Sequence, residues 1–323
     1  MNTTRRQMLL AAGAAMLPLD AFAQADYPNH SVQITHGFGA GGNADVVARL
    51  ITQKLQENLK QPVIVDIKAG AGGSIATNFV AKSAADGYTL VMLTGAHTVS
   101  SAIRRTQPYD PVKDFSFIST VSTFPFVVAV SENHPAKKLA DLLAIAKANP
   151  GKVTFTSVGV GSTQHMVGEL LASTGGVEML HVPYRGGGQP AQAVIGGDVE
   201  VLLDTPTVAL PHVKSGRLRA LGVTSLASWP ILRGVPPVSA ALPGFEVRSW
   251  LGLAAPAGLP APVSRKLVEE VHRALNDSGL QQGLATVASL PFPSTPAEMQ
   301  TMIQSEIERW RGVVKKAGIP QQA

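Results

Sequence analysis

Two glycine-rich turns near the start of the chain have the residue types and the spacing of an anion-binding site. The first covers residues 36–45 and the second residues 68–74, and each lies between a β-rich apolar run and a helical pattern. Glycine lets the backbone turn so that several N–H groups point at one spot, where the start of a helix adds partial positive charge. The two turns therefore predict a site for a phosphate or a carboxylate.

A third glycine turn, at residues 157–165, leads into a further helical pattern and carries hydroxyl groups. Ser162 and Thr163 can cap that helix or donate hydrogen bonds to a ligand. Arg185 stands beside a run of three glycines, where its paired donors could clamp a carboxylate or form a surface ion pair. Asp45 falls in the first turn of the helix after the first glycine turn, where a carboxylate stabilises the helix end.

Residues typical of catalytic and metal sites are missing or scattered. The chain has no cysteine, which excludes a catalytic thiol, a zinc–cysteine cluster and an iron–sulfur site. Its eight histidines form no pair at metal-ligand spacing, and neither a Gly-x-Ser-x-Gly nucleophile motif nor a Gly-Lys-Ser/Thr phosphate loop occurs. Amide-rich turns without a nucleophile or a base predict a binding site, with no metal, no cofactor and no catalysis.

One alternative stays open at the first turn. Gly37, Gly39 and Gly42 match the dinucleotide fingerprint Gly-x-Gly-x-x-Gly, and Asp66 lies in the next expected strand, where a ribose-binding carboxylate belongs. The second glycine turn crowds the place of the adenine ribose, which argues against a nucleotide. An exported NAD(P)-dependent oxidoreductase is therefore the alternative to a binding protein.

The composition fits a globular protein with room for two domains. The chain has 323 residues, of which 45% are hydrophobic and 15% charged. Its formal net charge of +5 is spread without a Lys/Arg cluster, and 5% of the residues are aromatic. This pattern argues against nucleic acid as a partner and suits a small acidic ligand.

The first 23 residues have the three regions of a signal peptide. Arg5 and Arg6 lie in a short polar start, residues 8–19 are mostly apolar, and residues 21–23 have the small-x-small form of a cleavage site. The adjacent arginines also resemble a twin-arginine signal. We expect cleavage near Ala23 and a mature protein in the periplasm.

Strand and helix patterns alternate along the chain. Such alternation predicts α/β construction with parallel strands, and with ligands bound outside the carboxyl ends of the strands. In the first part, strands are expected at residues 31–36, 63–67 and 89–93, and helices at residues 44–59 and 75–82. The alternation restarts after residue 124, and a late strand at 251–255 precedes amphipathic helices at 261–275 and 297–314.

This organisation predicts two lobes with a ligand cleft between them. Lobe 1 is discontinuous and consists of residues 24–123 and 229–323, whereas lobe 2 consists of residues 124–228. The two crossings between the lobes are hinge candidates, and such lobes close around their ligands.

The motifs, taken in order, resemble those of one known family. The chain is similar to the Bug (TctC-type) extracytoplasmic solute receptors, the substrate-binding proteins of tripartite tricarboxylate transporters. The resemblance covers nearly the whole mature chain. Its motifs are residues 39–42 with Asp45, 70–73, 86–90, 108–111 with 114–115, 161–163 with His165, 181–186, 196–199 and 250–256.

The resemblance implies a type II periplasmic-binding-protein fold that clamps a small carboxylate, such as an organic acid, a dicarboxylate or an amino acid. It also implies delivery of that ligand to membrane permease subunits, although a ligand-loaded partner of a sensor kinase would have the same fold. In the family, backbone amides of the two lobe 1 turns hold one carboxylate, partly through water, and lobe 2 selects the rest of the ligand. The residues carried over are Phe38, Ala40, Gly41, Gly42, Asn43 and Asp45, Ala71, Gly72 and Gly73, and in lobe 2 Ser162, Thr163, His165, Tyr184, Arg185 and Asp204.

Two of the glycines allow a specific expectation. A β-branched residue at Gly41 or Gly72 should abolish ligand binding and leave the protein folded, because it would block the close approach of the backbone to the ligand.

Overall fold

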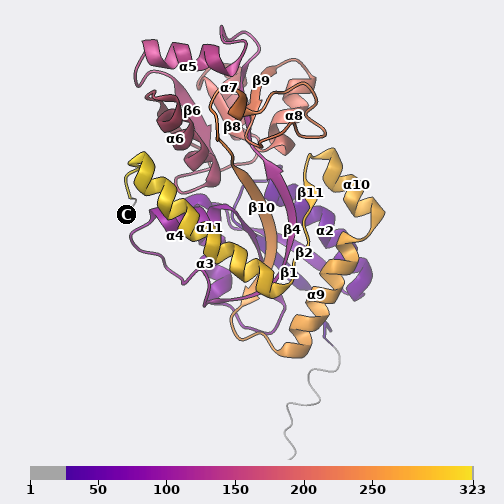
Figure 1. Ribbon diagram of the computed structural model, residues 1–323. Helices are drawn as coiled ribbons and strands as arrows, with labels where there is room; N and C mark the ends of the chain where they lie inside the picture. Colours follow the sequence, from indigo (N-terminus) through magenta and orange to yellow (C-terminus); the bar gives the residue numbers. More distant parts are fainter. Residues whose placement is uncertain (1–26, 322–323) are drawn as a thin grey trace, which may run out of the picture.

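The computed structural model describes residues 27–321, which form two α/β lobes that are each built on one sheet (Figure 1). The predicted signal peptide lies outside the described residues. Within residues 27–321, no helix is both long and apolar enough to cross a membrane.

Lobe 1 contains the six-stranded sheet, in which the strand order is β11-β4-β10-β3-β1-β2. The first three strands of the chain are parallel, as the sequence predicts, whereas β10 runs antiparallel to both β3 and β4. The strands are β1 (Val32–His36), β2 (Val63–Ile67), β3 (Thr89–Thr94), β4 (Phe115–Pro125), β10 (Arg248–Pro256) and β11 (Leu290–Pro291).

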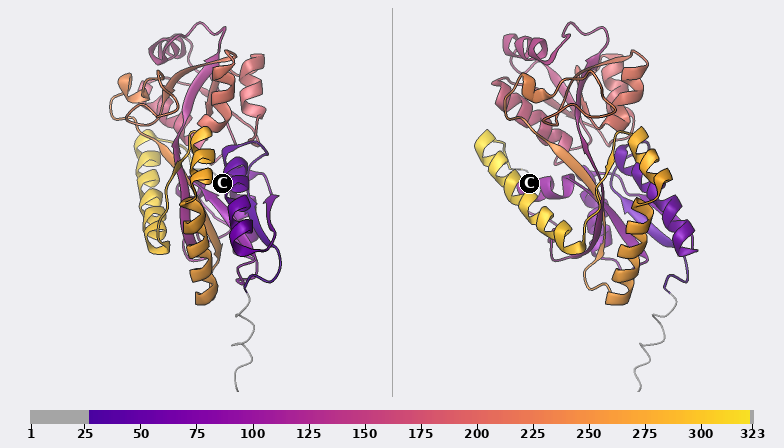
Figure 2. Two further views of the ribbon diagram at one scale, coloured as in Figure 1. Left: turned by 90° about the vertical axis from the view of Figure 1, so that its right-hand side faces the viewer. Right: turned by 45° about the vertical axis from the view of Figure 1, so that its right-hand side comes forward.

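Helices cover both sides of the lobe 1 strands. Helices α2 (Asn43–Leu59), α9 (Ala261–Leu275) and α10 (Ser278–Thr286) pack together, and α3 (Ser74–Ala81) contacts β1 and β3. Helix α11 (Pro296–Ala317) packs on α4 (Ala96–Ile103) and β4, and it also reaches lobe 2. Figure 2 shows α11, in yellow, on one side of the central strands and α2 with α9 on the other.

Lobe 2 contains the five-stranded sheet, with the order β7-β6-β8-β5-β9. Strand β6 is parallel to β7 and β8, and β5 is antiparallel to β8 and β9. The strands are β5 (Val127–Ser131), β6 (Thr154–Ser157), β7 (Leu180–Pro183), β8 (Val201–Asp204) and β9 (Leu218–Val223). The helices are α5 (Leu139–Ala148), α6 (Thr163–Gly175), α7 (Gln189–Gly196) and α8 (Pro206–Lys214).

Two segments connect the lobes. Phe126 alone separates β4 from β5, so the first crossing is one residue long. The predicted return lies near residue 229, but in the structure the chain stays beside β9 after that point, where the N–H of Val223 donates to the carbonyl of Pro236 (2.9 Å). The short helix η3 (Val238–Ala240) follows there, and the chain enters lobe 1 at β10.

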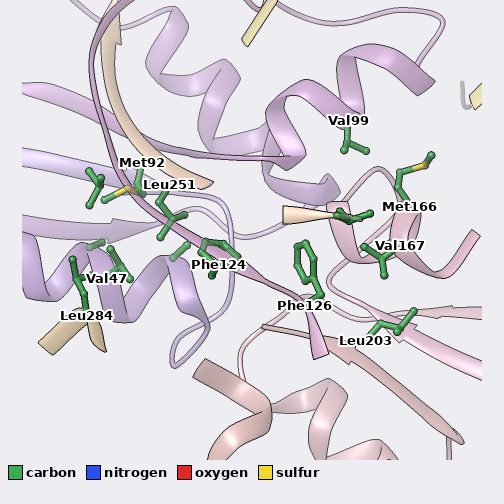
Figure 3. Packing of buried hydrophobic residues seen from close by; sticks show 14 of the residues in the cluster. Val47, Met92, Val99, Phe124, Phe126, Met166, Val167, Leu203, Leu251 and Leu284 are labelled. Carbon is green, nitrogen blue, oxygen red and sulfur yellow. The ribbon is translucent and has the colours of Figure 1, made fainter. Parts of the chain in front are cut away.

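The apolar core continues through the first crossing. One cluster of buried residues includes Val47 and Leu251 of lobe 1 as well as Met166 and Leu203 of lobe 2. Figure 3 shows Phe124 and Phe126 on the connecting strand between these two groups. Both aromatic rings are buried. The packing of this connection therefore links the cores of the two lobes.

Candidate functional site

A small cavity lies between the lobes, at the carboxyl ends of strands from both sheets. Its volume is about 40 Å³, which is room for about three water-sized groups at roughly 10–15 Å³ each. Thr94 at the end of β3 and Asp204 at the end of β8 both line it. The prediction that ligands bind outside the strand ends therefore coincides with an actual cavity in the structure.

Three helices begin at this cavity. Gly42 and Asn43 line it at the start of α2, Thr163 at the start of α6, and Thr205 directly before α8. The first N–H groups of a helix have no partner within the helix, and they carry partial positive charge. Three helix N-termini around one cavity form a site that favours a bound anion.

The cavity offers neutral hydrogen-bonding groups rather than cations. The hydroxyl-bearing residues Thr94, Thr163 and Ser249 line it, together with the amide side chains of Asn43 and Gln164. Among the described residues, no Lys or Arg belongs to its lining, and the only ionisable side chain there is a carboxyl group. An anion in this cavity would be held by backbone N–H groups and by neutral donors.

Apolar side chains complete the lining and would contact the carbon skeleton of a ligand. Phe38, Phe124 and Leu251 come from lobe 1, Val208 comes from lobe 2, and Phe126 comes from the crossing between them. Polar groups at the helix starts and an apolar wall beside them are the usual features of a site for a small organic molecule.

Asn43 and Asp204 each have one polar atom without a partner. Asn43 Oδ1 lies 2.6 Å from the hydroxyl of Thr207 and 3.3 Å from that of Ser289, and its Nδ2 is buried without a hydrogen bond. Asp204 Oδ1 accepts hydrogen bonds from the N–H of Thr205 (2.7 Å) and from Gln164 Nε2 (3.3 Å), while Oδ2 is buried without one. Burial raises the pKa of Asp204 to about 6.

The lobes touch each other through glycine backbones beside the cavity. A Cβ atom added at Gly187 of lobe 2 would lie 2.5 Å from the carbonyl oxygen of Ala40 in lobe 1. A Cβ at Gly72 of lobe 1 would lie 2.8 Å from the carbonyl oxygen of Val160 in lobe 2. These separations leave no room for a side chain, so glycine is needed for the lobes to close as they do here.

The structure brings together five of the residues predicted for the site. Phe38, Gly42, Asn43, Thr163 and Asp204 all line the cavity, and they come from both lobes.

The second glycine turn, at residues 68–74, does not line this cavity. Gly72 and Gly73 border a separate pocket of about 10 Å³ behind Phe38, which His97 and Tyr109 also line. One water needs roughly 10–15 Å³, so this pocket has about the size of a single water. Ala71 lines neither space.

Other predicted residues support the turns from outside the cavity. Asp45 Oδ2 accepts the N–H of Gly41 (2.9 Å), and its Oδ1 accepts from Arg49 (3.0 Å). Burial raises the pKa of Asp45, but the hydrogen bonds from Arg49 and Gly41 outweigh it, so that the pKa lies below its ordinary value. Ser162 caps α6 by accepting the N–H of His165 (3.2 Å).

Three further lobe 2 residues, together with Ala40 in lobe 1, lie outside the cavity lining. The ring of His165 stacks on that of His181 with 4.1 Å between ring centres. Tyr184 is half-buried against a hydrophobic cluster of lobe 2, and the side chain of Arg185 is exposed. The backbone of Arg185, rather than its guanidinium group, faces lobe 1, because its carbonyl accepts the N–H of Gly39 (3.2 Å).

The sequence predicts that Gly41 and Gly72 are glycine so that the backbone can approach a ligand closely. The structure gives a different reason at each position. A Cβ at Gly41 would meet no atom within 4 Å, so space is not what requires glycine there. Its φ of +77° does, because L side chains rarely adopt that conformation. At Gly72 the close approach is real, but the neighbour is the backbone of the opposite lobe.

Several lining residues were not identified from the sequence. Thr94 follows a predicted strand, and the rule on strand ends would have found it. Phe124 and Phe126 lie directly after the predicted crossing between residues 123 and 124, where a two-lobed protein has its cleft. Thr205 directly follows the end of β8, so the same rule on strand ends would have found it. Ser249 has no sequence signal of that kind, since only the pairing of β10 with β4 places it at the cavity.

The dinucleotide alternative conflicts with the packing around the first turn. The N–H of Gly39 is already bonded to lobe 2, and a Cβ at Gly37 would lie 2.3 Å from the Cα of Gly73. Asp66 forms an ion pair with Lys68 (3.0 Å). The two lobes and the second glycine turn occupy the space that a pyrophosphate and a ribose would need. Residues 27–321 also contain no group of three or more His, Asp or Glu side chains placed to hold a metal ion.

Comparison with known proteins relates this architecture to one family. The sequence profile of TctC, described as the tripartite tricarboxylate transporter family receptor, matches residues 47–319. Among solved structures, the chain is similar to the periplasmic binding protein BugD, with 29% sequence identity, a TM-score of 0.88, and coverage of 92% of this chain and 100% of that one.

Two further solved structures are similar to the chain and contain ligands. Rpa4515 of R. palustris with adipate is 33% identical, with a TM-score of 0.88 and coverage of 91% of this chain and 99% of that one. MatC of Rhodopseudomonas palustris with bound malate is 31% identical, with a TM-score of 0.85 and coverage of 89% and 100%. These likenesses extend over both lobes, so the fold is that of a periplasmic binding protein.

Proposed function

The chain belongs to the TctC family of tripartite tricarboxylate transporter receptors, and we propose that it captures one small organic carboxylate between its lobes and delivers it to the membrane subunits of such a transporter. The family consists of binding proteins, and the chain is a receptor rather than an enzyme. We further propose that residues 1–23 direct it to the periplasm, where it meets both its ligand and the permease.

The convergence of three helix N-termini on a cavity without cationic side chains carries this proposal. A carboxylate needs several hydrogen-bond donors, and the first N–H groups of α2 and α6 are placed to supply them without a Lys or Arg in the lining. Helix α8 adds the positive end of its dipole, because Pro206 has no N–H and the N–H of Thr205 is bonded to Asp204. The apolar wall formed by Phe124, Phe126 and Leu251 suits the carbon chain of an organic acid better than an inorganic anion.

The named ligands of two relatives support the ligand class. Rpa4515 is described with adipate and MatC with malate, and both compounds are small dicarboxylates. At 31–33% identity the fold and the location of the site are shared, and we propose a ligand of the same class, a small carboxylate.

Isothermal titration with a panel of C3 to C6 mono- and dicarboxylates tests the proposal. Each acid is paired with its neutral amide, which keeps the shape and removes the charge, and NAD and NADP are titrated separately. We expect saturable binding of at least one acid and none of its amide. Binding of NAD or NADP together with failure of every acid would overturn the receptor assignment.

Mass spectrometry of the protein purified from periplasm provides an independent measurement. A closed binding protein retains tightly bound ligand through purification, so the released compound should be a carboxylic acid with a mass in the range of the panel.

A further inference from the structure

Exposed apolar side chains lie beside the second glycine turn of lobe 1. Ile75 and Phe79 are one turn apart on α3 and are 51% and 43% exposed, and Ile64 on β2 is 50% exposed. Ile64 and Asp66 point to the same side of β2, because side chains alternate along a strand. The ammonium group of Lys68 lies 3.0 Å from the carboxylate of Asp66 and 4.3 Å from the centre of the Phe79 ring. These contacts place the exposed face of α3 next to that side of β2.

Lobe 2 continues this apolar surface with Val160, which lies in the third glycine turn and is 37% exposed. A Cβ at Gly72 would lie 2.8 Å from the carbonyl oxygen of Val160, so the second and third turns touch. Ile75 directly follows the second turn in the chain. The surface therefore runs from one lobe to the other and is complete only when the lobes are closed. We name it the seam patch, and its members are Ile64, Ile75, Phe79 and Val160.

The seam patch gathers most of the apolar side chains that the protein exposes. Within residues 27–321, seven large hydrophobic residues are exposed, and four of them belong to the patch. Single exposed apolar residues are common on soluble proteins, whereas a group of them on one surface marks a site of interaction.

Cations border the seam patch. Lys68 contacts it directly, and Arg104 Nη2 donates to a carbonyl of the second glycine turn (3.1 Å). A Cβ at Gly161 would lie 3.8 Å from Arg104 Nε, so this side chain also lies against the third turn. Arg105 follows it and is exposed. Asp66 pairs with Lys68, and in the described part of the chain neither arginine has a carboxylate partner. The border is therefore positively charged and suits an acidic partner.

A membrane subunit of the transporter fits this surface better than a second copy of the chain does. Two copies related by a two-fold axis would place the same patch on itself and would bring cations against cations. A membrane subunit must distinguish a loaded receptor from an empty one, and a surface that closure completes provides that distinction.

We propose that the seam patch, with Lys68, Arg104 and Arg105 at its border, binds an acidic segment with apolar side chains on the periplasmic side of the membrane subunits. The inference rests on the proposed function, because it concerns delivery by the same closed receptor. A partner that contacts both lobes stabilises the closed form, and by reciprocity the bound ligand raises the affinity for that partner.

Spheroplasts of the native bacterium test the inference, after deletion of the receptor gene and addition of purified receptor. Uptake of the acid that binds best in the titration panel is measured at increasing receptor concentrations. The half-saturating receptor concentration reports docking, whereas isothermal titration of the same protein reports ligand affinity. We expect saturable uptake with the wild type.

Ile75→Glu and Phe79→Glu should each raise the half-saturating concentration about 10-fold or more, because a carboxylate then loses water against an acidic partner. Both residues are exposed, so the affinity for the acid should stay within about twofold of the wild-type value. Leu226→Glu is the matched control and should behave as the wild type. Leu226 is 54% exposed and follows β9, at the opposite edge of the lobe 2 sheet from β7, whereas Val160 follows β6 beside β7.

Arg105→Glu tests the charge of the partner. The variant should raise the half-saturating concentration about 5- to 10-fold, and the increase should shrink at high salt, because salt screens charges on a surface. Arg233→Glu is the matched control, since Arg233 is also exposed and lies beyond β9. Unchanged or improved docking of Arg105→Glu would contradict an acidic partner.

Three results would overturn the inference and leave the receptor function standing. Ile75→Glu and Phe79→Glu support uptake at wild-type receptor concentrations, or Leu226→Glu is impaired as much as they are. In the third, their affinity for the acid falls by the same factor as their docking, which would mean that the patch supports closure rather than a partner.

Two other occupants of the patch have measurements of their own. Sedimentation with vesicles that contain phosphatidylglycerol detects a lipid surface, and analytical ultracentrifugation detects a second copy. Vesicle binding or dimerisation of the wild type that Ile75→Glu abolishes would assign the patch to that occupant and overturn the inference. Wild-type protein that binds the acid but restores no uptake would instead contradict delivery to a transporter, which belongs to the proposed function.

Discussion

The N–H of Gly39 lies 3.2 Å from the carbonyl oxygen of Arg185, and this hydrogen bond joins the first glycine turn of lobe 1 to lobe 2. At this turn the two lobes therefore meet through backbone atoms. Gly186 faces Gly39, and Gly187 lies so close to the carbonyl oxygen of Ala40 that the contact depends on the absence of a side chain at Gly187. The glycine turns thus let the lobes close, in addition to the anion binding that we propose for the first of them.

Gly72→Ala should weaken ligand binding by preventing this closure. The added Cβ would lie 2.8 Å from the carbonyl oxygen of Val160, and relieving such a contact costs about 1–3 kcal/mol. Because this contact exists only when the lobes are closed, it should lower the affinity for the ligand roughly 5- to 150-fold. Isothermal titration with the acid that binds best in the panel measures the change.

Gly41→Ala is the matched control. Its φ of +77° is as unfavourable for alanine as the +63° at Gly72, but its Cβ would meet no atom within 4 Å. Both variants should lose about 1 kcal/mol of stability, and only Gly72→Ala should lose much affinity. Equal affinities in the two variants would show that the lobe contact does not matter for binding.

Thr224→Val should destabilise the connection between the lobes. The hydroxyl of Thr224 accepts the N–H of Phe126 (2.8 Å) and donates to the carbonyl of Val247, so one buried group links both crossings. Valine has nearly the same shape, but it leaves the N–H of Phe126 without its partner, which costs about 1–3 kcal/mol. Urea unfolding measures the loss. Thr224→Ser keeps the hydroxyl and should lose clearly less stability than Thr224→Val. Equal losses of stability in the two variants would mean that the effect comes from packing.

The predictable part of the fold is the part with strong local patterns. Helix α9 and strand β2 have the predicted bounds, because their apolar periodicity and flanking turn residues agree. Strand β4 was missed. It is buried on both faces, and serine and threonine interrupt its apolar residues, so neither alternation nor a continuous apolar run marks it. Helix α8 contains Pro211 in its interior, where proline usually indicates a break.

The site was predictable to the extent that it consists of glycine turns and strand ends. Phe38, Gly42 and Thr163 belong to turns that follow strands, and all three line the cavity. The sequence cannot separate a turn residue that faces the cavity from one that holds the turn in place. Asp45 and His165 have the residue types of a binding site, yet the structure uses Asp45 to hold Gly41 and packs His165 against His181.

Asp45→Ala should loosen the first glycine turn and destabilise the protein by about 1–3 kcal/mol, because the N–H of Gly41 loses a charged acceptor. Arg49→Ala is the control: it removes the exposed partner of Asp45 and should cost less than about 1 kcal/mol. The folded pKa of Asp45 lies below its ordinary value. Its contribution is therefore present at neutral pH and is lost as the pH falls through the folded pKa. Urea unfolding at pH 7 and pH 3 should give a smaller difference between wild type and Asp45→Ala at the lower pH.

The contribution of Asp204 to the free energy of unfolding should have the opposite pH dependence. Burial raises its pKa from 3.8 to about 6, so the folded protein binds the proton more tightly than the unfolded chain does. The free energy of unfolding should then fall as the pH rises from about 4 to 6, by roughly 3 kcal/mol from this group. Gln164 and Thr205, which contact the carboxyl group, do not titrate, so burial decides the sign.

Asp204→Asn isolates this contribution, because asparagine does not titrate and all other groups stay the same. Relative to the ligand-free wild type, the variant should gain stability steadily between pH 4 and pH 6 and keep a constant advantage above pH 7. Urea unfolding of both proteins at half-unit steps gives that difference directly. A difference that stays constant over the whole range would mean that Asp204 titrates near its ordinary pKa. The hydrogen bonds from Gln164 and Thr205 would then compensate the carboxylate against the cost of its burial.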